Sequence, residues 1–306
     1  MAPGLRRERR EALQVCAVPL AVNASWTLDP VPIVLIAAAA VIYGRRWHAV
    51  RRSARQARSH QAMQRVLRHD APRWRALCYA LGLLAVVAAL ISPVDELGHQ
   101  VLTMHMVQHL LLLDVAPILA ILGFTRVILR PATRRFMEIE RRAGFLATPV
   151  FAALFYVVTM VAWHVPALYD AALRHDGVHV LEHVCFGIAG ALYWWHLLSP
   201  IPGRHRLTGM GPVIYMAGTK VAVGIVGIVI TFAPDALYAF YANQGTVWGM
   251  SPTTDQHVAG ALMAVEQSLV MGTALAWLFI RMLGESQRTD ERRDRYEPES
   301  TVPSAR

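Results

Sequence analysis

The sequence is poor in charged residues, lysine and cysteine, and each shortage excludes a class of protein. Charged residues make up 17% of the 306 positions, against about 25% in ordinary soluble domains. The three cysteines, Cys16, Cys78 and Cys185, are too few and too far apart for a disulfide-stabilised fold. Lys220 is the only lysine among 30 basic residues. The sequence also lacks a Walker loop, a dinucleotide fingerprint and a nucleophile motif, which argues against the common enzyme classes.

Apolar residues are abundant instead, at 55% of the chain with a mean hydropathy of +0.36. They form continuous runs long enough to cross about 30 Å of hydrocarbon, which takes about 20 helical residues. Continuous runs favour helices over barrel strands, which alternate with a period of two. The sequence therefore predicts an all-α integral membrane protein with seven transmembrane helices. The predicted spans are residues 30–48, 74–92, 100–123, 147–166, 178–199, 210–232 and 258–283.

Arginines concentrate in alternate connections between these spans. Ten lie in residues 45–75, six in residues 126–142 and six from residue 281 onward. Basic connections stay in the cytoplasm, so the N-terminus is predicted outside and the C-terminus in the cytoplasm. The net charge of +9 is thus a topology signal, and no nucleic-acid partner is expected.

The predicted chain has three parts: an outer N-terminal segment (1–28), the seven-helix domain (29–283) and a disordered cytoplasmic tail (284–306). The tail is polar, mixed in charge and without an apolar face. Arginines at positions 6, 7, 9 and 10 oppose the predicted orientation. A signal peptide ending near residue 24, or a start codon assigned too early, would each remove this conflict.

Histidines separate into two groups on this topology. Five lie on the cytoplasmic side and are interpreted as solvated or interfacial: His48, His60, His69, His196 and His205. Eight lie in the outer loops or outer halves of the spans: His99, His105, His109, His164, His175, His179, His183 and His257. Two groups have the four-residue spacing that places side chains on the same face of a helix. One is His105 with His109, and the other is His175 with His179 and His183. Ionisable residues inside a membrane are functional candidates, so this group predicts a site.

The chemistry suited to clustered imidazoles is metal or haem binding, and thioether sulfur additionally favours Cu(I). Met160 precedes His164 by one helical turn, while Met104 and Met106 flank His105. Packing is the commoner role of methionine. The outer-side carboxylates Glu182, Asp170 and Asp255 are candidates for accepting the second ring N–H of bound imidazoles, helix capping being the alternative for the aspartates.

A second polar group lies deeper in the predicted membrane domain. Lys220 falls near the middle of the sixth span, with Asp114 and Glu266 at similar depth in the third and seventh. A lone charge there is costly, so an ion pair of Lys220 with one or both acids is expected to clamp three helices together. Proton or ion passage is the alternative function of these three residues.

The chain resembles the multi-spanning CtaG family of cytochrome c oxidase assembly factors in bacterial inner membranes. The resemblance is carried in order by HMVQHLLL (105–112), WHVPALYDAAL (163–173), HVLEH (179–183), WW (194–195) and DQHVAG (255–260). One departure is Ala264 after Met263, where the family pattern has tryptophan. These stretches cover the third to seventh spans.

The resemblance implies a non-enzymatic copper chaperone that delivers copper, as Cu(I), to the haem–copper oxidase on the periplasmic side. Its partners would be oxidase subunits and other copper chaperones. His105, His109, His164, His179 and His183 match the family pattern; His99, His175, His257 and Met160 are second-rank ligands. A b-type haem redox protein and an assembly scaffold without metal transfer remain alternatives. A di-iron oxidase is disfavoured because adjacent histidine pairs are absent from the sequence, and an ion transporter rests on Lys220 alone. The sequence gives no indication of the oligomeric state.

Overall fold

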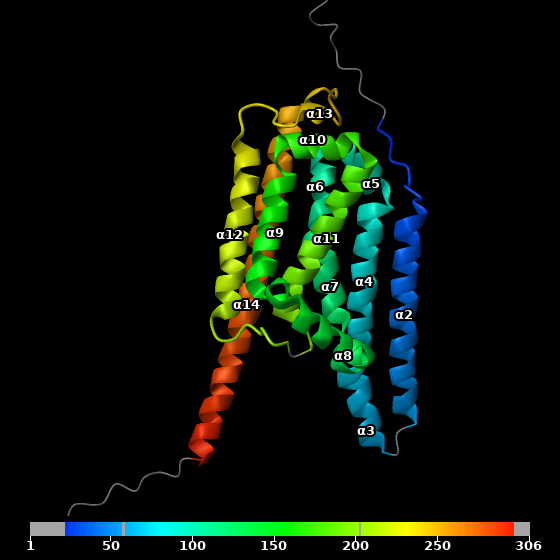
Figure 1. Ribbon diagram of the computed structural model, residues 1–306, viewed down its shortest axis with the longest axis vertical. Helices are drawn as coiled ribbons and strands as arrows, with labels where there is room; N and C mark the ends of the chain where they lie inside the picture. The colour runs from blue at the N-terminus through cyan, green and yellow to red at the C-terminus, as the bar shows by residue number, and fades with distance from the viewer. Residues whose placement is uncertain (1–21, 57–58, 202, 297–306) are drawn as a thin grey trace, which may run out of the picture.

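The computed structural model describes residues 22–56, 59–201 and 203–296 and shows an all-α protein. Its long helices run roughly parallel in one bundle (Figure 1). The helices that run along the bundle are α2 (Pro30–Arg55), α4 (Arg73–Leu90), α6 (Leu102–Leu110), α7 (Ala116–Gly123), α9 (Pro149–Trp163), α11 (Asp176–Leu198), α12 (Gly211–Phe232) and α14 (Pro252–Tyr296). The remaining helices are α3 (His60–Arg65), α5 (Pro93–Gly98), α8 (Arg126–Ala143), α10 (Pro166–Arg174) and α13 (Ala239–Ala242).

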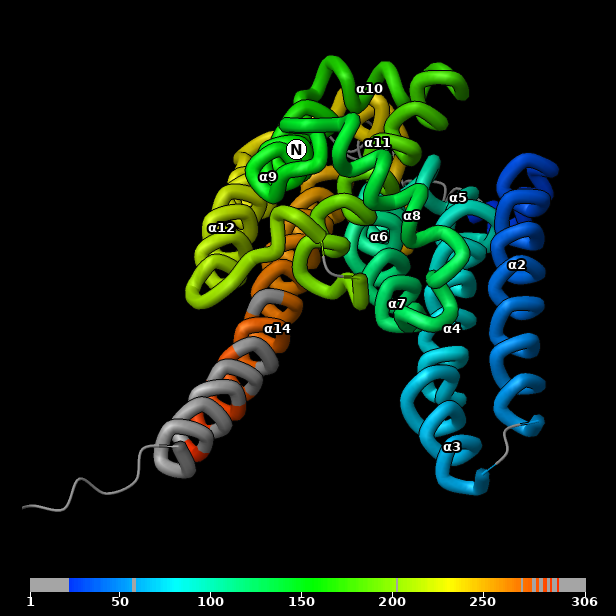
Figure 2. Tube along the Cα trace, turned by 60° about the horizontal axis from the view of Figure 1, so that its bottom comes forward, coloured from blue at the N-terminus to red at the C-terminus, as the bar shows by residue number. Residues whose placement is uncertain are grey.

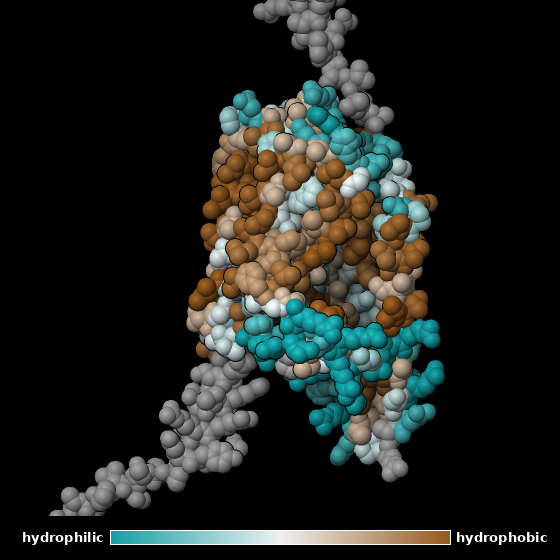
Figure 3. Space-filling view, viewed as in Figure 1, coloured by the Kyte–Doolittle hydropathy of each residue, from teal (hydrophilic) through white to brown (hydrophobic). Residues whose placement is uncertain are grey.

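The chain is a multi-pass membrane protein. Five helical segments are long and apolar enough to cross a membrane: Pro30–Arg55, His60–Leu90, Leu102–Gly123, Gly211–Phe232 and Pro252–Ala276. Arg126–Ala147 and Pro149–Trp163, bent by 62°, make a sixth if they form one span. Large apolar side chains such as Ile42 and Leu269 are 70% and 65% exposed, and they form a hydrophobic belt above a hydrophilic band (Figure 3). Such exposure suits contact with lipid.

Each of the seven predicted spans falls on a helical segment, although the structure does not by itself give seven crossings. The predicted fifth span lies on α11, whose three histidines and Glu182 keep its hydropathy below that of the five segments. At the C-terminus, α14 continues to Tyr296, so residues 284–296, expected to be irregular, are helical. The predicted signal peptide falls largely on residues 1–21, which lie outside the described residues.

One face of α11 packs against α7, α9 and α10 (Figure 2), and the opposite face, which carries Val180 and Leu181, is exposed. The helix packs beside the π-helical turn Leu111–Val115 that joins α6 to α7. Pro117 has no N–H for the carbonyl of Leu113, four residues earlier. A Cβ added to Gly190 of α11 would overlap that carbonyl group, at 2.8 Å from its carbon. Glycine at position 190 therefore lets α11 approach the irregular turn.

Replacing Gly190 with alanine is expected to destabilise the protein by about 1–3 kcal/mol, the usual cost of overpacking. Gly187 is the matched control, because its added Cβ would meet no atom within 4 Å on the same helix. Gly187→Ala should leave stability unchanged or raise it by up to about 1 kcal/mol through helix propensity. Melting temperatures of the two variants in detergent test this, and equal values would contradict the close approach.

Candidate metal centre

Two buried histidines of α6 form one wall of the candidate centre. His105 and His109 are 0% and 1% exposed, with ring centroids 4.4 Å apart. The start of α6 is held by Asp255 of α14, which accepts hydrogen bonds from the backbone N–H groups of Leu102 (2.7 Å) and Thr103 (3.1 Å). A helix start leaves such N–H groups without intrahelical partners, so Asp255 caps α6 from another helix. It positions the histidine-bearing helix and does not orient an imidazole directly.

The opposite wall comes from α11. Glu182 is fully buried, and its two carboxylate oxygens lie 3.5 Å from His105 Nε2 and 3.4 Å from His109 Nε2. Ligand atoms of His105, His109, Glu182 and His183 all lie within 4.8 Å of one another. Three imidazoles and a carboxylate converging in this way can hold a metal ion. Glu182, predicted to orient histidines from behind, thus faces the same point as they do.

The polar atoms of this cluster have no hydrogen-bond partners among the described residues. Both ring nitrogens of His105 and His109, Nε2 of His179 and His183, and both oxygens of Glu182 are buried and unpartnered. Buried polar groups normally find partners, because leaving one unsatisfied costs about 1–3 kcal/mol. One atom each from His105, His109, Glu182 and His183 converges on the same point, so these four residues could hold a metal ion.

The cluster extends toward the end of the bundle where α5 and α10 lie (Figure 1). His179, 8% exposed, stacks on His105 with ring centroids 5.3 Å apart, and its ring lies tilted against that of His183 at 4.2 Å. The half-buried His99 touches His179 edge-on at 4.9 Å. Imidazoles therefore follow one another from the partly exposed His99 to the buried centre.

His164 lies on the other side of His109, at a ring distance of 5.8 Å. Its Nδ1 is 2.6 Å from the carbonyl oxygen of Met160, which can only accept, so Nδ1 carries the proton and donates. The unprotonated Nε2 then faces Met106 Sδ at 3.4 Å. Met160, the predicted second-rank ligand, contributes its carbonyl, and Met106 presents the sulfur.

Three predicted residues lie apart from the centre. His175 is exposed at the start of α11. His257 directs Nε2 to the carbonyl oxygen of Ala233 at 3.0 Å. Asp170 accepts from the N–H groups of Ala239 (3.2 Å) and Phe240 (3.1 Å) and so caps α13. Position on the outer side was the signal for His257 and Asp170, and it does not resolve which way a side chain turns. His175 was also predicted from its four-residue spacing to His179, but it precedes α11 in an extended conformation, so helix geometry does not place it on that face.

Sequence reasoning did not single out two aromatic residues that line the centre. Phe186 stacks on His109 at 4.1 Å, and Tyr169 lies against His105 at 5.1 Å. Burial raises the pKa of Tyr169 well above its usual value, so its hydroxyl stays neutral. Phe186 follows Glu182 by four residues and shares its helix face, which could have identified it.

The deeper polar group forms a separate network. Lys220 Nζ lies 3.0 Å from both oxygens of Asp114 and 2.6 Å from the Tyr156 hydroxyl. Asp114 also accepts from Tyr156 (2.9 Å) and from Trp194 Nε1 (2.7 Å). The predicted pairing with Asp114 is present and joins α12 to the turn after α6. Glu266 accepts from Gln267 Nε2 at 2.6 Å and forms no salt bridge within the described residues.

Comparison with known proteins gives the family. The sequence profile described as "Cytochrome c oxidase caa3 assembly factor" matches residues 41–285. An uncharacterised protein of Mycobacterium leprae is 22% identical over 240 residues, and uncharacterised proteins of Mycobacterium bovis and Mycobacterium tuberculosis are 23% identical. Each match covers 74% of this chain but 36% of the relative. No solved structure matches the chain. The profile covers most of the chain, which therefore belongs to the cytochrome c oxidase caa3 assembly factor family.

Proposed function

We propose that this protein is a non-enzymatic copper chaperone that binds Cu(I) at His105, His109, Glu182 and His183, with His164 and Met106 as a neighbouring pair of donors, and passes it to the oxidase. The observation that carries the proposal is the convergence of four ligand atoms within 4.8 Å of one another, from three buried residues and the half-buried His183. The family description supports an oxidase as the acceptor, and other copper chaperones are the further partners in this proposal. Copper is the cargo in this account.

Two features favour Cu(I) over zinc. His164 Nε2 and Met106 Sδ are both electron-pair donors, yet they face each other at 3.4 Å. A soft monovalent cation joins such a pair favourably, and thioether sulfur selects Cu(I). The second feature is charge. Glu182 is the single carboxylate of the centre, and its one negative charge balances the one positive charge of Cu(I) but not the two of Zn²⁺. His179 and His99 would provide the path by which the ion enters or leaves.

The close packing of the rings favours a metal ion over the haem alternative. Neighbouring imidazoles of the centre lie 4.2 to 5.8 Å apart by centroid. A haem ligated by two histidines carries one imidazole on each face of its flat macrocycle, and rings this close leave no slot for the macrocycle between them. A scaffold without metal transfer would leave the unsatisfied donor atoms without a reason.

The proposed orientation has seven crossings in a bacterial inner membrane, with α11 as the fifth and the centre on the periplasmic side. The arginine count supports it, since α8 and the segment before α4 are basic whereas the connection between α9 and α11 carries only Arg174. Copper would then be delivered at the end of the bundle where α6 and α11 begin.

A chromosomal deletion complemented by variants tests the chaperone role. Loss of this protein should lower both the copper content and the activity of the membrane oxidase, and the wild-type gene should restore both. His183→Ala should fail to restore them, whereas His175→Ala, outside the centre, should succeed. Full restoration by His183→Ala would favour the scaffold.

Replacing Met106 with leucine tests the choice of metal. The change keeps the buried volume and removes the sulfur that faces His164. Retention of Cu(I) by purified protein should fall by roughly tenfold, while retention of Zn²⁺ should change little. Competition with a chelator of known affinity measures both. An equal loss of the two metals would show that Met106 has only a packing role.

A further inference from the structure

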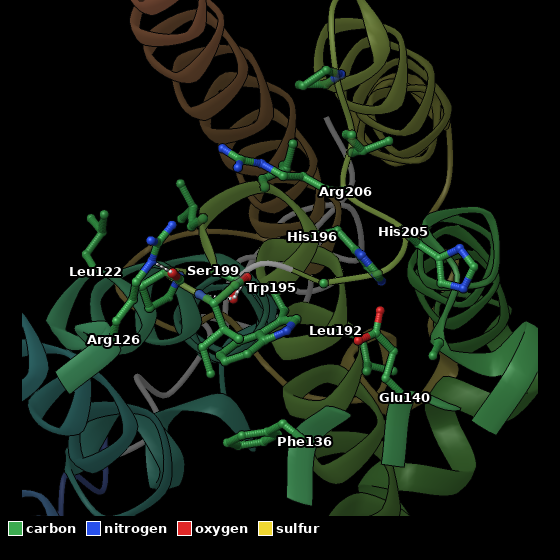
Figure 4. Close-up of a pocket in the computed structure, with 18 of the residues that line it drawn as sticks. Leu122, Arg126, Phe136, Glu140, Leu192, Trp195, His196, Ser199, His205 and Arg206 are labelled. Carbon is green, nitrogen blue, oxygen red and sulfur yellow. Dashed lines mark hydrogen bonds between the residues drawn. The ribbon is translucent and has the colours of Figure 1, made fainter. Parts of the chain in front are cut away.

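A cavity of about 1260 Å³ lies at the end of the bundle opposite the candidate metal centre. We call it the arginine-rich cavity, after Arg75, Arg126 and Arg206 in its lining. Its walls are α8, the last turns of α11 and the segment between α11 and α12 (Figure 4). Pockets for small molecules measure about 300–1,000 Å³, so this one has room for a larger ligand.

The floor of the cavity is apolar. Phe136 of α8 packs against Trp195 of α11 with ring centroids 5.5 Å apart. Leu192 and Leu122 continue the same surface (Figure 4). Phe136 remains 40% exposed and Ile139 62% exposed. An apolar floor of this kind suits acyl chains better than it suits a free polar metabolite.

The rim carries basic residues from two different segments. Arg126 begins α8, while His205 and Arg206 belong to the segment before α12 (Figure 4). Arg126 Nε donates to the carbonyl oxygen of Pro200 at 2.7 Å, which leaves its terminal nitrogens free for a ligand. Neither Arg126 nor Arg206 is within 4 Å of a carboxylate among the described residues.

Two acids, Glu140 and Asp70, also line the cavity, and the Glu140 carboxylate lies toward His196 and His205 (Figure 4). The Oε1 atom of Glu140 accepts the backbone N–H of Arg204 at 2.7 Å. The backbone carbonyl oxygen of Asp70 accepts from Thr125, the residue before Arg126. The guanidinium groups outnumber the carboxylates, so the rim suits an anion.

The cavity sits where phospholipid headgroups would lie. A hydrophilic band crosses the molecule at this end, directly below the hydrophobic belt (Figure 3). The helix α8 is strongly amphipathic, with Phe136, Met137 and Ile139 exposed beside arginines. Such helices lie in the membrane interface.

We propose that the arginine-rich cavity binds an anionic glycerophospholipid. The phosphate and headgroup contact Arg126, Arg206 and His205, and the acyl chains lie along Trp195 and Phe136. Basic pockets between helices at the cytoplasmic face are a known setting for anionic headgroups. The bound lipid would fill the space between α8 and α11, and this role is independent of any metal at the histidine centre.

Native mass spectrometry of the purified full-length protein, offered phosphatidylglycerol or phosphatidylcholine with identical chains, tests the proposal. We expect wild type to retain phosphatidylglycerol about tenfold better, from two arginines near the headgroup. Arg126→Gln with Arg206→Gln should bring the ratio close to one. Arg141→Gln with Arg142→Gln should leave the ratio unchanged, because these arginines pair with Glu138 outside the cavity.

A second variant covers the case in which loss of Arg126 rearranges the segment it holds. Ala191→Trp should block the floor and reduce retention of both lipids while every charge remains. Equal retention of the two lipids by wild type would overturn the proposal. So would an unchanged preference in the double arginine variant, or competition by inorganic phosphate as effective as that by the lipid.

Discussion

Purified protein in which His105 and His109 are both alanine is expected to retain almost no metal. The two imidazoles supply two of the four converging ligands, and both face Glu182 at 3.4–3.5 Å. Losing a residue that merely supports a metal ligand weakens binding by about 10–100-fold, so losing two ligands should exceed that range. Metal analysis by mass spectrometry after copper loading measures the effect.

The matched control replaces His175 and His257, which also lie on the histidine-rich side but outside the centre. That double variant should bind as much metal as wild type. Glu182→Gln provides a further comparison, because it removes the carboxylate charge and keeps the shape. Unchanged metal content in the His105→Ala, His109→Ala protein would remove α6 from the site.

Lys220→Met is expected to cause the largest loss of stability. It leaves Asp114, fully buried, without its cation. Removing one partner of a buried ion pair costs about 3–5 kcal/mol, because the remaining charge is uncompensated. The melting temperature in detergent should fall by roughly 10 °C.

Adding Asp114→Asn to Lys220→Met should recover most of that stability. Asparagine removes the unpaired charge and can still accept from Tyr156 and Trp194. Recovery would support the clamp between α12 and the turn after α6. Unaltered stability of Lys220→Met combined with lost oxidase assembly would instead favour proton or ion passage.

The helical segments were predictable because hydrophobic length and helix geometry set them. Runs such as 210–232 fall on α12 almost residue for residue. The number of crossings was less secure, because the polar residues that build the site lower the hydropathy of α11. The sequence also gave no sign that α14 continues to Tyr296.

The i and i+4 spacing within α6 and α11 predicted the centre, since it depends on local geometry alone. His105, His109, His179 and His183 accordingly come together. Contacts between helices could not be predicted in this way. Met106 reaches His164 from another helix, and only the packing of α6 against its neighbours determines that contact. The roles of the carboxylates were equally dependent on packing, because Asp255 and Glu182 were both predicted to orient imidazoles and differ in which helices surround them.

Metal analysis together with an optical spectrum, on wild-type protein purified from membranes supplied with copper, tests the central claim most directly. The account predicts nearly stoichiometric copper without a Soret band, since the closely packed imidazoles hold an ion. A Soret band would contradict it in favour of a haem protein. Absence of bound metal after copper loading would contradict it in favour of an assembly scaffold.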